Sequence, residues 1–169
     1  MNAAVVQQSF ARTQFAREHF DTVIDEIELL VDAHYGEVNH HPDIPPGIDK
    51  AKYQTAEKIG ILRVYTVRVD DLLVGYEVFM VGFSMHYCTS FQARMDTLFI
   101  HPAYRKGIMG FRFLRWVQQQ LEAEGVEVGY RHHKILEGGR LDLAPIFKRL
   151  GWEPIYVMYF RRFKALRHA

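Results

Sequence analysis

The chain has 169 residues, of which 49% are apolar and 24% are charged. This length and balance predict one ordinary globular domain with a sizeable core, and they exclude a second full domain. The 21 basic and 20 acidic side chains leave a net charge of +1, so no strong field favours nucleic acid or an anionic membrane as a partner. No apolar run reaches the ~20 residues that a membrane span requires.

Cys88 is the only cysteine, and an internal disulfide is therefore excluded. The first ten residues lack the charged and then apolar pattern of a secretory signal. Together these features predict a cytoplasmic protein. Cys88 is interpreted as a small hydrophobic residue rather than a reactive thiol.

The first part of the chain predicts an extension followed by two helices. Residues 1–20 carry scattered apolar positions and are expected to form a partly helical extension. Thr22 is expected to cap a helix with Asp25, and this helix ends near Gly36. Its apolar face recurs at helical spacing: Val23, Ile24, Ile27, Leu30, Val31 and His34. Three prolines follow, and residues 49–60 then predict a short helix that Asp49 opens and Gly60 closes.

The middle of the chain predicts strands and then a strand, loop and helix unit. Residues 61–69 and 72–85 are β-rich and only Asp70 and Asp71 separate them, which is the length of a tight hairpin loop. Residues 93–102 predict a further strand. A helix follows whose apolar stripe ends at Gly125, a residue suited to a left-handed helix end: Gly110, Phe113, Leu114, Val117 and Leu121.

The last third predicts a strand at 126–133, a helix at 142–150 closed by Gly151, and a final strand at 152–163. The strand, helix and strand series over 94–133 implies a parallel pair joined by a right-handed crossover. The expected organisation is an α/β domain over 21–163 and a basic tail over 164–169.

The stretch LFIHPAYRKGIMGFRFL carries the most chemical information, because a strand runs through a short loop directly into a helix. Unpaired amides at a helix N-terminus, together with small residues, bind the oxygens of a pyrophosphate. The loop residues Arg105, Lys106 and Gly107 precede this helix start. A glycine-containing turn alone is weak evidence, since many α/β loops contain one.

These residues resemble the acetyl-CoA signature of the GNAT acetyltransferase superfamily, with Ile100-x-Pro102 ending the strand and Arg105 and Gly110 following. Ile108 stands where the first glycine of the signature is usual. Either Gly107 does the same work in a shifted loop, or the pyrophosphate binds more weakly. LAPIFKRLGW also resembles the helix and Gly-aromatic ending of the family, and the likeness covers roughly residues 21–163. Loop sequences resemble, more loosely, members encoded by bacteriophages and prophages.

The resemblance implies a GNAT fold: a central mixed, mostly antiparallel sheet that is splayed between a parallel strand pair and flanked by helices. It implies acetyl-CoA as co-substrate and an amine, in a small molecule, peptide or protein, as acceptor. The oligomeric state is left open, with a homodimer as one alternative. The residues expected to bind acetyl-CoA are Leu98, Phe99, Ile100, Arg105, Lys106, Gly107, Ile108 and Gly110.

Transfer from a thioester to an amine requires a proton acceptor and a donor to the leaving thiolate, but no enzyme nucleophile. Many family members use a tyrosine of the last helix as that donor, and Phe147 stands at the matching position. The alternatives are a water molecule or one of several side chains: Tyr130, Tyr156, Tyr159 and His132. Asp96 and His132, on adjacent parallel strands, are the candidate bases, and His132 suits proton exchange near neutral pH.

A polar cluster begins at the end of the first helix and continues beyond it: His34, Tyr35, Glu37, His40, His41 and Asp43. Its spacing matches no closed metal site, so no metal is expected. The cluster is interpreted as a substrate-facing loop. The residues expected to contact the acceptor are His34, Tyr35 and Glu37 near this loop and His86 and Tyr87 at a strand junction.

Three functions remain open from the sequence. The first is an N-acetyltransferase that moves an acetyl group from acetyl-CoA directly to an amine. The second is a non-catalytic module that binds CoA or a protein, which the substitutions at Phe147 and Ile108 suggest. The third is a nucleic-acid-directed acyltransferase, supported only by the phage resemblance and the basic tail, so nucleic acid is not the expected partner.

Overall fold

A computed structural model describes residues 12–39, 43–134 and 142–161 of the chain. These residues form a five-stranded sheet of order β1-β2-β3-β4-β5. Its first four strands are antiparallel neighbours, and β4 and β5 are parallel. The strands are β1 (Thr13–Glu18), β2 (Leu62–Val69), β3 (Leu72–Phe83), β4 (Phe91–Ile100) and β5 (Val128–Tyr130).

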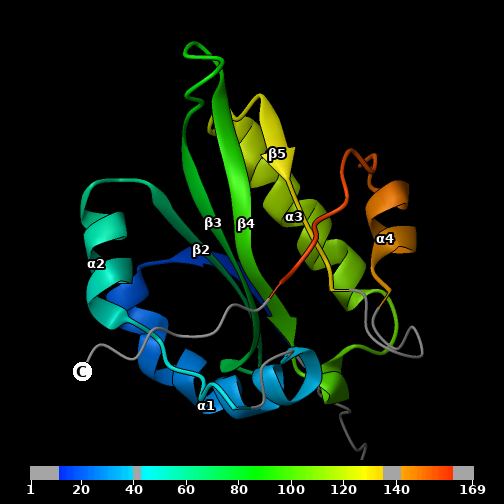
Figure 1. Cartoon of the computed structure of the whole chain (residues 1–169). Helices are drawn as coiled ribbons and strands as arrows, with labels where there is room; N and C mark the ends of the chain where they lie inside the picture. Colours follow the sequence, from blue (N-terminus) through cyan, green and yellow to red (C-terminus); the bar gives the residue numbers. More distant parts are fainter. Residues whose placement is uncertain (1–11, 40–42, 135–141, 162–169) are drawn as a thin grey trace, which may run out of the picture.

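Helices cover both faces of this sheet (Figure 1). One apolar cluster packs α1 and α2 against the first face, and a second packs α3 against the other. The α3 helix also provides the crossover between the parallel strands β4 and β5. The mixed, mostly antiparallel architecture expected from the sequence is confirmed. The helices are α1 (Phe20–Val38), α2 (Lys50–Lys58), α3 (Met109–Ala123) and α4 (Ala144–Arg149).

Local signals place several of these elements correctly. Asp70 and Asp71 have positive φ values of 49° and 65°, as the tight turn of the predicted hairpin requires. The side chain of Asp49 accepts a hydrogen bond from the Lys52 amide and caps α2. Gly125 and Gly151 have φ values of 84° and 86° just after α3 and α4, the left-handed conformation expected at a helix end.

The beginning of the described chain differs from the prediction. The partly helical extension is wrong for residues 13–18, which form β1 and pair antiparallel with β2. The free edge of the β2–β3 hairpin supplies the backbone partners that a short isolated helix would lack. The cap expected at Thr22 is also wrong, because α1 begins at Phe20 and the Thr22 hydroxyl donates to the carbonyl of His19. Residues 1–11 lie outside the described residues.

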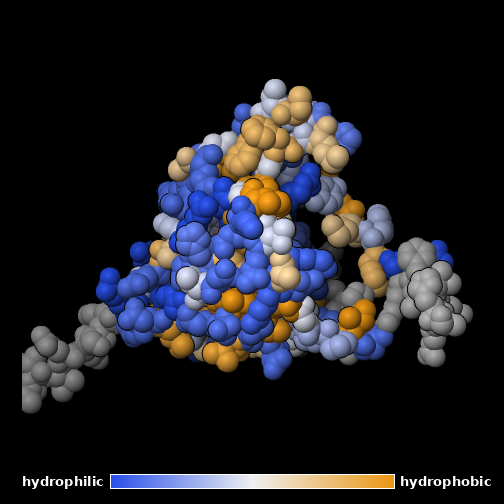
Figure 2. Space-filling view, turned by 90° about the vertical axis from the view of Figure 1, so that its left-hand side faces the viewer, coloured by the Kyte–Doolittle hydropathy of each residue, from blue (hydrophilic) through white to orange (hydrophobic). Residues whose placement is uncertain are grey.

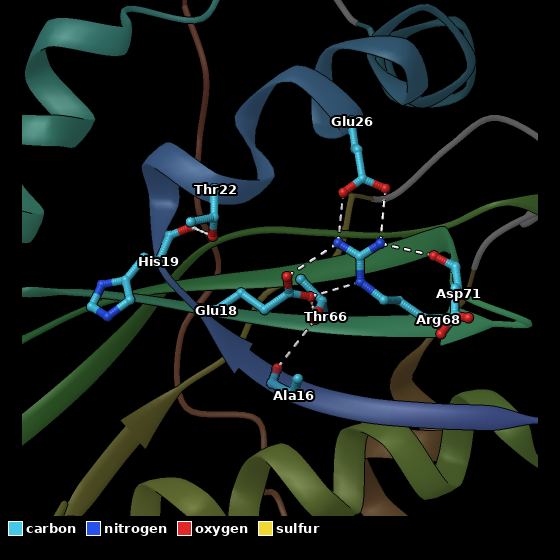
Figure 3. A network of polar contacts seen from close by, with 8 residues as sticks. All are labelled: Ala16, Glu18, His19, Thr22, Glu26, Thr66, Arg68 and Asp71. Carbon is cyan, nitrogen blue, oxygen red and sulfur yellow. Dashed lines mark hydrogen bonds and ion pairs between the residues drawn. The ribbon is translucent and has the colours of Figure 1, made fainter.

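A charged network joins β1, β2 and α1 (Figure 3). The Arg68 guanidinium of β2 contacts Glu18 of β1 and Glu26 of α1, at 2.9 Å and 2.7 Å. The Thr66 hydroxyl also donates to Glu18. Each carboxylate accepts charge-assisted bonds from the guanidinium, so the network fixes where α1 crosses the first two strands.

The end of the domain also differs from the prediction. Residues 152–161 form no strand, and β5 is shorter than the predicted 126–133. Trp152 instead packs over Gly129, where an added Cβ would lie 2.6 Å from its ring, and the Trp152 indole donates to Gln118. Beyond it the apolar side chains over 155–160 are exposed, so β-propensity alone did not produce ladder pairing. The predicted tail at 164–169 lies outside the described residues.

A buried ion pair connects β3 to the chain beyond β5. Arg131 Nε and Nη2 donate to the two carboxylate oxygens of Glu77 at 2.8 Å and 3.0 Å, and both side chains are 0% exposed. Arg131 Nη2 also donates to the Leu114 carbonyl of α3. The rest of the guanidinium faces aromatic rings, including that of Trp152 at 4.7 Å, and its Nη1 atom has no hydrogen-bond partner among the described residues.

The face that carries α2 is mostly hydrophilic, and hydrophobic residues appear there in small separate groups (Figure 2). This agrees with helices that turn their apolar stripes toward the sheet. None of the helices in the described part of the chain is long and apolar enough to span a membrane.

Replacing Arg131 by Met should strongly destabilise the fold. The change leaves Glu77 charged and buried without its partner, which typically costs about 3–5 kcal/mol. The double variant Glu77→Leu/Arg131→Met removes both charges and should recover most of that loss. Urea unfolding of the three proteins measures the differences. An Arg131→Met variant within about 1 kcal/mol of the wild type would contradict the structural role of this pair.

Candidate active site

The parallel strands β4 and β5 part soon after they meet. They pair only from Gln92–Val128 to Arg94–Tyr130, whereas β4 continues to Ile100. A cavity of about 410 Å³ lies where they separate. Its lining comes from both faces of the sheet, with α1 and α2 on one side and α3 and α4 on the other. The cavity therefore joins the two faces through the gap between the strands.

Asp96 sits at an irregularity of β4 that faces this cavity. Val78 of β3 pairs with Thr97, but the next residue, Phe79, pairs with Met95, so Asp96 is an extra residue in the ladder. This β-bulge changes which residues face each side: Met95 packs in the α3 cluster and Phe99 in the α1 cluster, although an even spacing should place them together. The bulge thus turns Asp96 toward α2.

The Asp96 carboxylate accepts a hydrogen bond of 2.5 Å from the hydroxyl of Tyr53 in α2. Burial and the neighbouring carboxylate raise the pKa of Tyr53 well above its usual value. Tyr53 consequently stays protonated and acts as a hydrogen-bond donor that orients Asp96.

His132 and Asp96 both line the cavity, Asp96 from β4 and His132 from the residues that follow β5. Burial lowers the pKa of His132 below its usual 6.5, and the negative charge of Asp96 opposes this effect only in part. The imidazole is therefore neutral at pH 7 and can accept a proton. The sequence prediction that these two residues face one cleft agrees with their positions, while their catalytic roles stay a prediction.

His34 lines the same cavity but belongs to the core of α1. It is 7% exposed, its Nδ1 lies 2.8 Å from the Tyr76 hydroxyl, and its ring stacks on Phe99. Burial lowers its pKa to about 4, so it is neutral at pH 7. Tyr35 and Glu37 also line the cavity from α1. All three lie in α1, which continues to Val38, whereas the sequence predicted that the helix ends near Gly36 and that Glu37 belongs to a substrate-facing loop.

The α3 side of the cavity contains several of the residues expected to bind acetyl-CoA. Leu98, Phe99, Ile100 and Gly110 all line it. The Arg112 amide donates to the Ile108 carbonyl and begins the helical pattern, so the preceding amides of this helix start have no acceptor in the helix. An added Cβ at Gly110 would meet only the Ile100 side chain, at 3.5 Å, so this part of the cavity is open.

Arg105 lines the cavity, but its guanidinium already has protein partners. It donates to both carboxylate oxygens of Glu37 and, from Nε, to the Ile100 carbonyl at 2.6 Å. Arg105 thus ties the loop after β4 to the end of α1. Lys106, Gly107 and Ile108 are exposed and outside the cavity lining, and Gly107 has the φ of 80° that favours glycine. Their contacts with a cofactor stay a prediction.

Other predicted site residues lie away from the cavity. Tyr130 is outside its lining, and Arg94 stacks over the Tyr130 ring at 4.3 Å. His86 and Tyr87 occupy the loop between β3 and β4 and are outside the cavity lining. Phe147 is buried against the ring of His133.

Sequence reasoning missed two tyrosines of the cavity, Tyr53 and Tyr76. Tyr53 lies in a polar helix, and nothing in its local pattern indicates that it reaches a strand 43 residues away. Glu77 gave a stronger signal, since it is a carboxylate inside an apolar β-run. The described residues contain no group of three or more potential ligands arranged to hold a metal, and His40 and His41 lie outside them.

Comparison with solved structures supports the architecture. AAC(6')-Iy in complex with a CoA-containing bisubstrate analogue matches with a TM-score of 0.66 at 13% identity, over 91% of this chain and 99% of that one. A ribosomal-protein-alanine N-acetyltransferase from Brucella melitensis biovar Abortus 2308 matches with a TM-score of 0.65 at 14% identity, over 90% of this chain and 99% of that one. The chain has the GNAT fold.

The GNAT fold does not by itself determine the activity. A protein described as a transcriptional regulator, from Bacillus halodurans C-125, matches with a TM-score of 0.68 at 14% identity, over 90% of this chain and 100% of that one. No family model and no curated protein matches the sequence. An argument for function therefore depends on the residues of the cavity.

The stability of the protein should depend on pH through His34. Its folded-state pKa is lowered, so its contribution is complete above the unfolded pKa of 6.5 and is lost as the pH falls toward about 4. Between pH 7 and pH 5 the wild type should lose about 2 kcal/mol more unfolding free energy than His34→Gln. Urea titrations at both pH values measure this difference. Equal losses in the two proteins would show that His34 is not held neutral.

Proposed function

We propose that this protein is an N-acetyltransferase that moves the acetyl group of acetyl-CoA directly to an amine. The observation that carries the proposal is one cavity that the start of α3 lines on one side and that a carboxylate and a neutral imidazole line on the other. Gly110 of α3 lines the first side of the cavity, and Asp96 and His132 line the second side. The similarity in fold to acetyltransferases supports this assignment.

Acetyl-CoA would enter from the α3 side. The amides at the start of α3 would hold the pyrophosphate, as helix N-termini commonly do. The open space at Gly110 would admit the pantetheine arm, which would then follow the separated edge of β4 at Leu98–Ile100. Its thioester would lie near the bulge at Asp96. We expect Lys106 to add charge attraction from the exposed loop.

The acceptor amine would approach from the α1 and α2 side. Asp96, oriented by Tyr53, would hold the ammonium group, which loses one proton to water and becomes the neutral amine. The amine nitrogen then attacks the thioester carbon, a C–N bond forms, and neutral His132 takes the second proton from this nitrogen. The C–S bond breaks to release CoA thiolate. No covalent enzyme intermediate is needed.

The thiolate needs a proton, and Phe147 has none to give. The tyrosine hydroxyls of the cavity at Tyr53 and Tyr76 are hydrogen-bonded, and burial raises the pKa of both. A tyrosine with a raised pKa is a poor acid toward a thiolate. We propose that the imidazolium formed at His132 returns its proton to the thiolate, directly or through water.

The other two functions stay alternatives. A non-catalytic module would bind CoA without transfer, and the apolar Ile108 at the helix start favours weaker binding. A nucleic-acid-directed acyltransferase and a phage origin stay predictions, since the basic tail that suggested the former lies outside the described residues. Thiol release in the presence of an amine distinguishes transfer from binding alone.

His132→Ala should lower kcat about 100-fold or more, within the usual range of general acid-base catalysis, because it removes the proton acceptor. CoA affinity should be unchanged, since the cofactor is expected to contact backbone and the start of α3. In the wild type the rate should decline only at pH values below 6.5, because burial lowers the pKa of His132, which must be neutral to accept a proton.

The measurement is thiol release across pH for each folded variant, with CoA affinity determined by calorimetry. Asp96→Asn should show the same pattern more mildly, because it keeps the shape of the side chain but removes its charge. If His132→Ala retains the wild-type rate and acidic limb, the base lies elsewhere.

A further inference from the structure

The acceptor half of the cavity has an unusual lining for a site that binds an amine. On the α1 and α2 side most of its wall is apolar, from Phe20, Ile24, Ile27, Val31, Ile48 and Val78, and the tyrosines Tyr35, Tyr53 and Tyr76 add aromatic rings with hydroxyl groups. Phe20, Ile24 and Ile27 repeat at helical spacing, so one face of α1 forms a continuous apolar surface. A wall of this kind favours an apolar substrate body over a polyhydroxylated one.

Negative charge in this half is confined to one position. Two carboxylates line the cavity, Glu37 and Asp96. Glu37 is neutralised by its two hydrogen bonds with Arg105. Asp96 is bound by the neutral hydroxyl of Tyr53, and it forms no ion pair among the residues that the structure describes. One carboxylate matches one ammonium group.

The remaining ionisable groups do not attract further cations. His34 and His132 have pKa values lowered by burial and are neutral at pH 7. Lys134 lines the cavity, and its ammonium donates to the Val38 carbonyl at the end of α1 at 2.7 Å. Among the described residues, a second or third cation on the substrate would therefore meet apolar side chains, neutral tyrosines or a positive charge, at a desolvation cost.

From this lining we infer that the acceptor is a monoamine whose single ammonium group is carried on an apolar body, such as an arylalkylamine. The inference rests on the proposed function and specifies its substrate class. Asp96 holds the ammonium, and the apolar face of α1 contacts the body. Polyamines, aminoglycosides and small polar amines lack one or both of these features.

The test compares kcat/KM for three amines with saturating acetyl-CoA. The arylalkylamine probe is 2-phenylethylamine, ethanolamine is a polar monoamine of the same charge, and spermidine is a polycation. We expect kcat/KM for 2-phenylethylamine to be at least tenfold higher than for each of the other amines, which corresponds to about 1.4 kcal/mol. A kcat/KM for spermidine or ethanolamine that lies within threefold of the value for 2-phenylethylamine, or above it, overturns the inference.

Two matched variants test whether the α1 face causes this preference. Val31→Asp places a second carboxylate in the partly exposed part of the cavity wall. It should raise the ratio of kcat/KM for spermidine to kcat/KM for 2-phenylethylamine at least tenfold. Leu29→Asp makes the same kind of change on α1 at a side chain that is 84% exposed and outside the cavity. It should leave the ratio as in the wild type. An equal change in both variants would overturn the role of the α1 face.

Calorimetry with the same amines separates this inference from the proposed function. If no amine is acetylated but 2-phenylethylamine binds at least tenfold tighter than the other two, transfer is wrong and the specificity inference stands. If the three amines bind equally, or none binds while acetyl-CoA does, the specificity inference is wrong.

Discussion

The ion pair between Arg131 and Glu77 determines how the chain leaves β5, and the cavity depends on it. The pair draws Arg131 under α3 and α4, where both side chains are fully buried. In an extended chain adjacent side chains point to opposite sides, which agrees with the position of His132 in the cavity lining beside Asp96. Burying a charged pair in the core costs desolvation free energy. The pair nevertheless specifies the path of the chain strongly, because either charged partner alone is unfavourable there.

The bulge at Asp96 and the separation of β4 from β5 act together. A regular strand would close the ladder and place alternate side chains evenly on the two faces. The extra residue moves a carboxylate to the α2 side, and the gap beyond Tyr130 opens a passage from one face of the sheet to the other. Under the proposed function the two substrates would enter from opposite sides and meet at this point, as direct transfer without an enzyme nucleophile requires them to meet.

Local patterns in the sequence predicted the elements that local physics controls. The β2–β3 hairpin followed from Asp70 and Asp71, and α3 followed from its apolar stripe and Gly125. The errors concern strands, whose formation depends on distant partners: residues 13–18 form a strand that pairs with β2, whereas 152–161 form no strand. For the cavity, the sequence predicted that Asp96 and His132 face one cleft, because it placed them on adjacent parallel strands. The sequence did not predict the contribution of Tyr53, because its contact with Asp96 arises only from the packing of α2.

The central claim is that this cavity binds acetyl-CoA at the start of α3, and calorimetric titration of the protein with acetyl-CoA tests it most directly. The wild type should bind one equivalent, and Gly110→Leu should bind at least tenfold more weakly, or about 1.4 kcal/mol, because the added side chain fills the path to β4. Gly82→Leu, at a β3 glycine with no atom within 4 Å of an added Cβ, should bind as the wild type does. No binding by the wild type, or equal binding by a folded Gly110→Leu, would contradict the account.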